Sequence, residues 1–171
     1  MSLLQEILAL AESTEQAALQ ASVDTLLGEA FDECLAAIMH EDSTLEEAKA
    51  VKAVVCMADD RTNVIPSDDE TVPKTVAKSL KESLDPEYQA DMEILEGLSD
   101  VSIVMLNTII AESFEQAVER ILKSDRKLRM VAKDGTKYKN RRRAAEAAVG
   151  ASMRAVFGKK GLAAKGRAGK K

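Results

Sequence analysis

The stretch VDTLLGEAFDECLAAIM, residues 23–39, decides the fold class of this chain. Its apolar residues recur every three or four positions, which is the spacing of one face of an α-helix. One row consists of Val23, Leu27, Ala30, Cys34 and Ile38, and a second row beside it consists of Leu26, Phe31 and Leu35. The stretch therefore predicts an amphipathic helix with a broad inward face.

The same spacing continues on both sides of this stretch. Upstream it joins Leu3, Ile7, Leu10 and Ala11, with Leu4 and Leu8 widening the stripe. Downstream a capping-box pair, Ser43 and Glu46, precedes an apolar face formed by Leu45, Ala48, Val51 and Val55. A long helix over about 100–130 is expected to face inward through Ile103, Ile110, Phe114, Ala117 and Ile121. A last helix over about 140–157 should begin at Asn140, end at Gly158 and pack through Ala145, Val149, Met153 and Val156.

The composition agrees with an all-α protein. Apolar residues make up 46% and charged residues 31% of the 171 residues, which is typical of a folded chain. Aromatic residues make up only 3%, so the core must consist of aliphatic side chains, Met and Ala. We expect a multi-helix bundle with a basic C-terminal helix and a flexible tail over 158–171, where four of the fourteen residues are Gly.

Three segments interrupt the helical pattern. Residues 59–73 contain two prolines and clustered acids, which predicts a loop and a possible subdivision of the body. A short helix is expected over about 74–84, and another is expected to start at Asp85 and Pro86 and to stop at Gly97 before a new cap in "LSD". Asp134-Gly135 predicts either the turn of a small hairpin or the end of the preceding helix.

The charge is divided sharply along the chain. Residues 1–122 contain 26 acidic and 7 basic residues, whereas residues 123–171 contain 3 acidic and 17 basic residues. The two parts carry formal charges of −19 and +14, which add to the net −5. We therefore predict an acidic helical body (1–122), a basic turn-plus-helix module (123–157) and a disordered basic tail (158–171). Such asymmetry indicates a polyanion or an acidic protein surface as the partner.

No enzyme motif accompanies this layout. The chain has no phosphate-binding glycine loop, nucleophile elbow or zinc-protease motif, and its one histidine, His40, lacks a neighbouring nucleophile. Neither the loop acids nor Cys34 and Cys56 have a metal-ligand spacing, so we expect no metal, no cofactor and two buried thiols. Residues 1–12 lack a basic start, and the apolar run 101–111 is too short to span a bilayer, so we expect a cytoplasmic protein without membrane contact.

The basic end contains the candidate binding residues. Arg141, Arg142 and Arg143 fall in the first turn of a predicted helix, where the macrodipole disfavours cations by about 0.3–1 kcal/mol each. A phosphate bound there would reverse that effect. Tyr138 is placed to stack on a base. The predicted nucleic-acid contacts are Lys133, Lys137, Tyr138, Lys139, Arg141, Arg142, Arg143, Arg154, Lys159, Lys160, Lys165, Arg167, Lys170 and Lys171.

These observations predict a non-enzymatic nucleic-acid-associated protein that contacts the phosphate backbone through its basic end without reading the base sequence. The acidic body would self-associate or dock a protein, and the apolar run 101–110 favours a homo-oligomer. The alternative is an assembly or scaffold protein whose basic end binds an acidic protein surface. In layout alone, the chain resembles the scaffolding and internal proteins of tailed-phage heads, which would place it inside a virion. A third possibility is that the basic tail folds back on its own acidic body.

Overall fold

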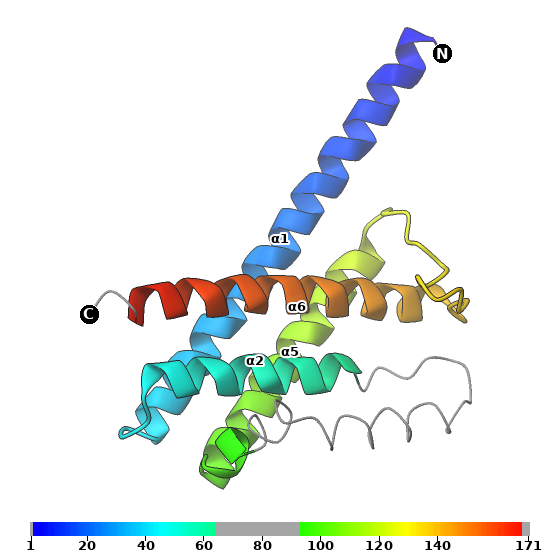
Figure 1. Cartoon of the computed structure of the whole chain (residues 1–171). Coiled ribbons are helices and arrows are strands. Elements are labelled where there is room, and N and C mark those ends of the chain that lie inside the picture. Colours follow the sequence, from blue (N-terminus) through cyan, green and yellow to red (C-terminus); the bar gives the residue numbers. More distant parts are fainter. Residues whose placement is uncertain (1, 64–92, 169–171) are drawn as a thin grey trace.

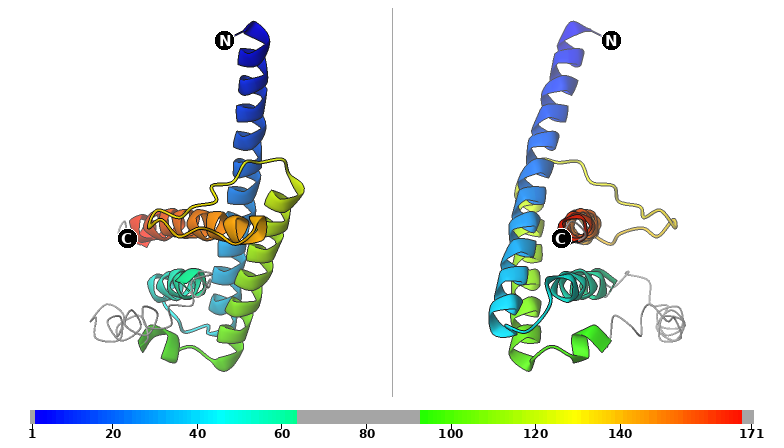
Figure 2. Two further views of the ribbon diagram at one scale, coloured as in Figure 1. Left: turned by 90° about the vertical axis from the view of Figure 1, so that its right-hand side faces the viewer. Right: turned by 60° about the vertical axis from the view of Figure 1, so that its left-hand side comes forward.

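The computed structural model describes residues 2–63 and 93–168 and confirms the all-α prediction. Within these residues the fold consists of α1 (Leu3–Glu41), α2 (Glu47–Asn63), α5 (Asp100–Lys123) and α6 (Arg141–Ala168). Figure 1 and Figure 2 show α1 and α5 lying antiparallel in one layer, with α2 and α6 crossing them steeply in a second layer. The basic helix is therefore packed on the acidic helices as part of the bundle.

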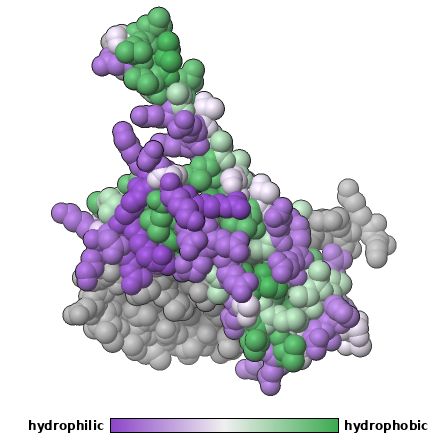
Figure 3. Space-filling model, turned by 180° about the vertical axis from the view of Figure 1, so that it is seen from behind, coloured by the Kyte–Doolittle hydropathy of each residue, from purple (hydrophilic) through white to green (hydrophobic). Residues whose placement is uncertain are grey.

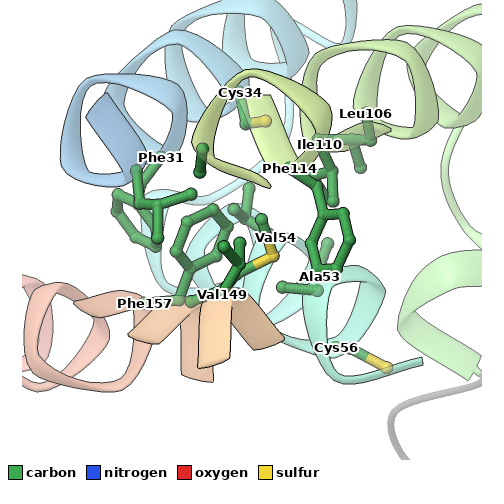
Figure 4. Packing of buried hydrophobic residues seen from close by; sticks show 14 of the residues in the cluster. Phe31, Cys34, Ala53, Val54, Cys56, Leu106, Ile110, Phe114, Val149 and Phe157 are labelled. Carbon is green, nitrogen blue, oxygen red and sulfur yellow. The ribbon is translucent and has the colours of Figure 1, made fainter. Parts of the chain in front are cut away.

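One hydrophobic core joins the two layers (Figure 4). α1 contributes the predicted row Val23, Leu27, Ala30, Cys34 and Ile38, together with Phe31. α6 contributes Ala145, Val149, Met153 and Phe157. The rings of Phe31 and Phe157 meet edge to face at 5.3 Å between centroids. A single cluster thus includes residues on both sides of residue 122, the boundary that the charge pattern suggested.

Serine residues cap the starts of α1 and α5. Ser2 caps α1 in a capping box with Gln5. Gly97 ends a helical turn over 93–96, and Ser99 caps α5 by accepting a hydrogen bond from the Ser102 amide. Asp42, which follows α1, accepts a 2.6 Å hydrogen bond from the Ser102 hydroxyl. This bond, with weaker bonds from Ser99, holds the pKa of Asp42 below its usual range.

Several predicted boundaries were wrong. α2 begins at Glu47, so Ser43 is not its cap, and it continues through residues 59–63 of the predicted loop. α5 ends at Lys123 instead of near 130, because the Ser124 hydroxyl donates to the Ile121 carbonyl and the Ser124 backbone is extended. The rest of the predicted loop, the helix over 74–84 and the start at Asp85 lie outside the described residues.

The final helix does not end at Gly158. α6 continues to Ala168, so residues 158–168 are helical instead of disordered. Gly161 is buried in this extension, where an added Cβ would lie 3.3 Å from a methyl carbon of Val55. The glycine permits close contact between α6 and α2, which offsets its low helix propensity of about 1 kcal/mol relative to Ala. Residues 169–171 lie outside the described part.

The predicted apolar start of α1 is not part of the core. Residues 3–15 are exposed all round, and Val23 is the first buried residue of the helix. We call residues 3–21 of α1 the arm. Figure 1 and Figure 2 show the arm projecting beyond the bundle, and Figure 3 shows its end as an apolar surface. Helical periodicity was therefore correct here, but it did not reveal what covers the apolar face.

The apolar run at the start of α5 is only partly buried. Val101 and Val104 are exposed, while Leu106 and Ile110 face the core. The run belongs to a 24-residue helix that is long and apolar enough, by length and composition alone, to cross a membrane. The inner side of that helix packs in the bundle through Phe114, Ala117, Val118 and Ile121.

Candidate nucleic-acid interface

The segment between α5 and α6 forms the hairpin that Asp134-Gly135 predicted. Val131 and Lys137 form an antiparallel bridge, and the Tyr138 amide donates to the Met130 carbonyl at 2.8 Å. Gly135 adopts a φ of +90°, a conformation that side-chain-bearing residues rarely take. The alternative prediction, a helix ending at this glycine, was wrong because α5 ends at Lys123.

The hairpin segment has side chains of differing exposure. Its odd-numbered residues, Arg129, Val131, Lys133, Gly135, Lys137 and Lys139, are all exposed. Among the even-numbered residues, Leu128, Ala132, Thr136 and Tyr138 are half-buried, whereas Met130 and Asp134 are exposed. The hairpin segment therefore carries four exposed bases, Arg129, Lys133, Lys137 and Lys139, which we call the basic face.

The turn of the hairpin also contains an acid. Asp134 accepts a 3.0 Å hydrogen bond from the Thr136 amide.

Tyr138 does not join the basic face. Its side chain is half-buried, whereas those of Lys133 and Lys137 are exposed, and its amide donates to the Met130 carbonyl. The structure thus separates Tyr138 from the lysines that precede and follow it in the sequence.

Arg141 closes the end of the neighbouring helix. Its guanidinium donates to the backbone carbonyls of Ser124 at 2.7 Å, Arg126 at 2.8 Å and Ile121 at 3.2 Å. These carbonyls lie at and just beyond the C-terminus of α5, where the macrodipole favours a cation. The start of α6 follows the predicted cap, because the Arg143 amide donates to Asn140 Oδ1 at 2.9 Å.

Arg142 and Arg143 have carboxylate partners within the bundle. Arg142 donates to both oxygens of Glu115 at 2.7 and 3.0 Å, and its Nε lies 3.2 Å from Glu146. These interactions raise the pKa of Arg142, the hydrogen bond to Glu115 most of all. Arg143 lies 3.0 Å from the other Glu146 oxygen. The unfavourable position of three arginines at a helix N-terminus thus has an explanation inside the protein, without a bound phosphate.

The remaining predicted contacts lie along α6. Arg154 and Lys159 are exposed, whereas Lys160 forms a 2.7 Å ion pair with Asp32 of α1. The backbone of Lys165 and Arg167 is helical, but their side chains, and Lys170 and Lys171 altogether, lie outside the described part. The structure therefore brings Lys133, Lys137 and Lys139 together and separates them from Arg154, Lys159 and Lys160 further along α6.

Sequence reasoning missed one member of the basic face. Arg129 was not a predicted contact, although it is exposed and lies two residues before Val131, which pairs with Lys137.

The opposite charge gathers on the outer side of the α1/α5 layer. A groove of about 240 Å³ lies between these helices, with Leu26, Ala30 and Ile109 among its lining residues. Glu29, Glu33 and Glu112 also line it. In the described part of the chain no cluster of metal-ligating side chains occurs. Cys34 and Cys56 are both buried, and neither forms a disulfide. Burial raises the pKa of the Cys34 thiol to about 12, with a contribution from Glu33.

Comparison with protein families, with curated proteins and with solved structures yields no match for this chain.

Proposed function

We propose that this protein is a non-enzymatic nucleic-acid-associated protein that contacts phosphate backbones through the basic face of its hairpin. One observation carries the proposal: four exposed bases, Arg129, Lys133, Lys137 and Lys139, lie close together in a hairpin segment that the Val131–Lys137 bridge joins. Lysine and arginine side chains spaced along a hairpin match the repeated charges of a nucleic-acid backbone. The hairpin projects from the bundle between α5 and α6, so a polyanion can approach it (Figure 1).

Phosphate contact without base readout agrees with the side chains of the basic face. Its members are Lys and Arg only, with no amide side chain to read a base edge and no aromatic ring to stack on one. Affinity would therefore come from charge and would depend little on sequence. The acidic α1/α5 layer would repel a polyanion and direct it to the hairpin.

The three arginines at the start of α6 are not part of the proposed contact set. Each already has hydrogen-bond or ion-pair partners in the bundle. Removing them from the set lowers the expected dependence of binding on salt. Three phosphates contacted by Arg129, Lys133 and Lys137 correspond to a slope of log K against log salt of roughly −2.7, and further contacts by Lys139, Arg154 and Lys159 would steepen it to roughly −5.4.

The test is a salt titration of the full chain with two duplex DNAs of unrelated sequence, followed by fluorescence anisotropy. We expect equal affinities for both duplexes and a slope between these two values. Absence of binding at low salt contradicts the proposal. A large difference between the two sequences would contradict phosphate-only contact.

A second candidate is an assembly protein whose basic face binds an acidic protein surface. The groove flanked by Glu29, Glu33 and Glu112 favours it, because the chain itself carries an acidic surface with an apolar floor. Two results together would favour this candidate over the first. The chain should self-associate in a salt-sensitive way that is lost when Lys133 and Lys137 are changed to Gln, and it should not bind DNA.

A further inference from the structure

The arm of α1 carries an apolar surface that the rest of the described chain does not cover. Leu3, Leu4, Ile7, Leu8 and Leu10 are each more than half exposed. Packing of an apolar face supplies most of the stability of helices in proteins. Apolar patches of a few hundred Å² on soluble proteins mark contact sites. A partner surface is therefore expected on the arm.

Six arm positions form one continuous seam. Leu3, Ile7, Leu10, Thr14, Ala17 and Ala21 alternate in steps of four and three residues, which is the spacing of a coiled-coil seam. All six are exposed. The Thr14 hydroxyl donates to the Leu10 carbonyl at 2.9 Å, so covering it leaves no donor unpaired. The partly covered residues Gln16 and Leu19 lie on the other side of the helix, and Gln20 flanks the seam at its base, which leaves the seam itself accessible.

The sizes of the seam residues are distributed unevenly along the arm. Large side chains occupy the tip, at Leu3, Ile7 and Leu10, whereas small ones occupy the base, at Ala17 and Ala21. A second arm running in the opposite direction places Leu3 against Ala21, Ile7 against Ala17, and Leu10 against Thr14. Each layer then combines a large with a small side chain, which keeps the distance between the helices constant. In a parallel pair, the large side chains at the two tips would face each other and crowd, and the small side chains at the two bases would leave a gap.

We propose that the arm of α1 pairs with the arm of a second copy of this chain in an antiparallel two-helix coil. The contact is isologous, since every residue pair occurs twice about the two-fold axis. The flanking positions follow the same rule: Leu4 faces Ala18 of the second copy, and Ala11 faces its own equivalent.

The charges of the arm permit this pairing. Glu12 and Glu15 lie on the side of the helix away from the seam, where they remain in water. Glu6 flanks the seam, and in the antiparallel register it lies opposite Gln20 of the second copy. No two acids meet, although the arm contains three acidic and no basic side chains.

The expected strength of the pair follows from its size. Two patches of a few hundred Å² each bury roughly 1,000 Å² in total, at the low end of specific interfaces. The dimer should therefore form and dissociate with protein concentration. This inference concerns the self-association part of the proposed function and does not rest on the nucleic-acid part, because it involves no residue of the hairpin.

Two matched substitutions test the surface. Ile7 and Leu8 are neighbours with the same exposure, 55%, but only Ile7 belongs to the seam. In sedimentation of the full chain without nucleic acid, we expect the unaltered protein and Leu8→Glu to dimerise as concentration rises. Ile7→Glu should remain monomeric at the same concentrations while keeping its helical circular dichroism. A monomer at every concentration for the unaltered chain, or equal behaviour of the two variants, overturns the proposal.

Cross-linking tests the orientation. Ile7→Cys and Ala17→Cys are prepared as separate full-length proteins and oxidised alone or mixed. In the antiparallel pair, residue 7 of one copy lies beside residue 17 of the other, and equivalent residues lie about 15 Å apart. That distance exceeds the roughly 7 Å that a disulfide spans. We expect covalent dimers in the mixture only; dimers in each separate sample would instead establish a parallel pair and overturn the antiparallel one.

Discussion

The guanidinium of Arg141 donates to the carbonyl of Ser124 at 2.7 Å, so that the first residue of α6 closes the last turn of α5. Two further carbonyls, those of Ile121 and Arg126, accept from the same side chain. A basic residue that appears misplaced within its own helix is therefore well placed for the neighbouring helix.

The contacts of Arg141 predict that Arg141→Ala destabilises the protein. The loss should be about 1–2 kcal/mol in urea unfolding, because charged hydrogen bonds to carbonyls are lost and the site is partly exposed to water. Arg154→Ala is the control, since Arg154 is an exposed base of the same helix and should change stability by less than about 0.5 kcal/mol. Equal losses in both variants would mean that net charge, not the carbonyl contacts, decides the effect.

The core predicts that α6 is needed for folding. Phe157 is buried against Phe31, and Phe157→Ala should cost about 3–5 kcal/mol and lower the thermal midpoint. Leu162→Ala is the control, because Leu162 is 70% exposed on the same helix and its removal leaves no cavity. For the same reason a fragment of residues 1–122, which lacks α6, should lack a cooperative transition. A sharp thermal transition of that fragment would contradict this view of the core.

The lowered pKa of Asp42 leads us to expect that the protein loses stability in acid. Its hydrogen bonds from Ser102 and Ser99 lower its pKa from the ordinary value of 3.8, so the folded state holds the proton less tightly than the unfolded state does. The stabilisation is fully present above pH 3.8 and is lost as pH falls through the lowered pKa of the folded protein. Urea midpoints measured from pH 5 downward should fall more steeply for the unaltered protein than for Asp42→Asn. Parallel curves would show that Asp42 is not a source of acid sensitivity.

We expect the Cys34 thiol to be unreactive in the folded protein. Its pKa of about 12 keeps it protonated at neutral and mildly alkaline pH, and its side chain is buried in the core. In a Cys56→Ser variant, a thiol reagent at pH 8 should leave the native protein unmodified and react once in denaturant. Rapid reaction of the native variant would contradict the burial of α1 against the second layer.

The sequence predicted the local features of the fold well and the tertiary ones poorly. Helical spacing, the Ser99 and Asn140 caps and the Asp134-Gly135 turn depend on neighbouring residues, and all are present. The partners of the arginines at the start of α6 could not be predicted, because Glu115 and the end of α5 approach them only through packing. The continuation of α6 beyond Gly158 likewise depends on contacts with α2.

The most direct test of the central claim is a comparison of two double variants in the salt titration with duplex DNA. Lys133→Gln/Lys137→Gln removes two bases from the basic face, and Lys49→Gln/Lys52→Gln removes two exposed bases from α2, so both lower the net charge by two. If the basic face holds phosphates, the hairpin variant should bind more weakly, and its slope of log K against log salt should flatten by up to about 1.8. The α2 variant should keep the slope of the unaltered protein. An unchanged slope in the hairpin variant, or the same flattening in both variants, would contradict the account.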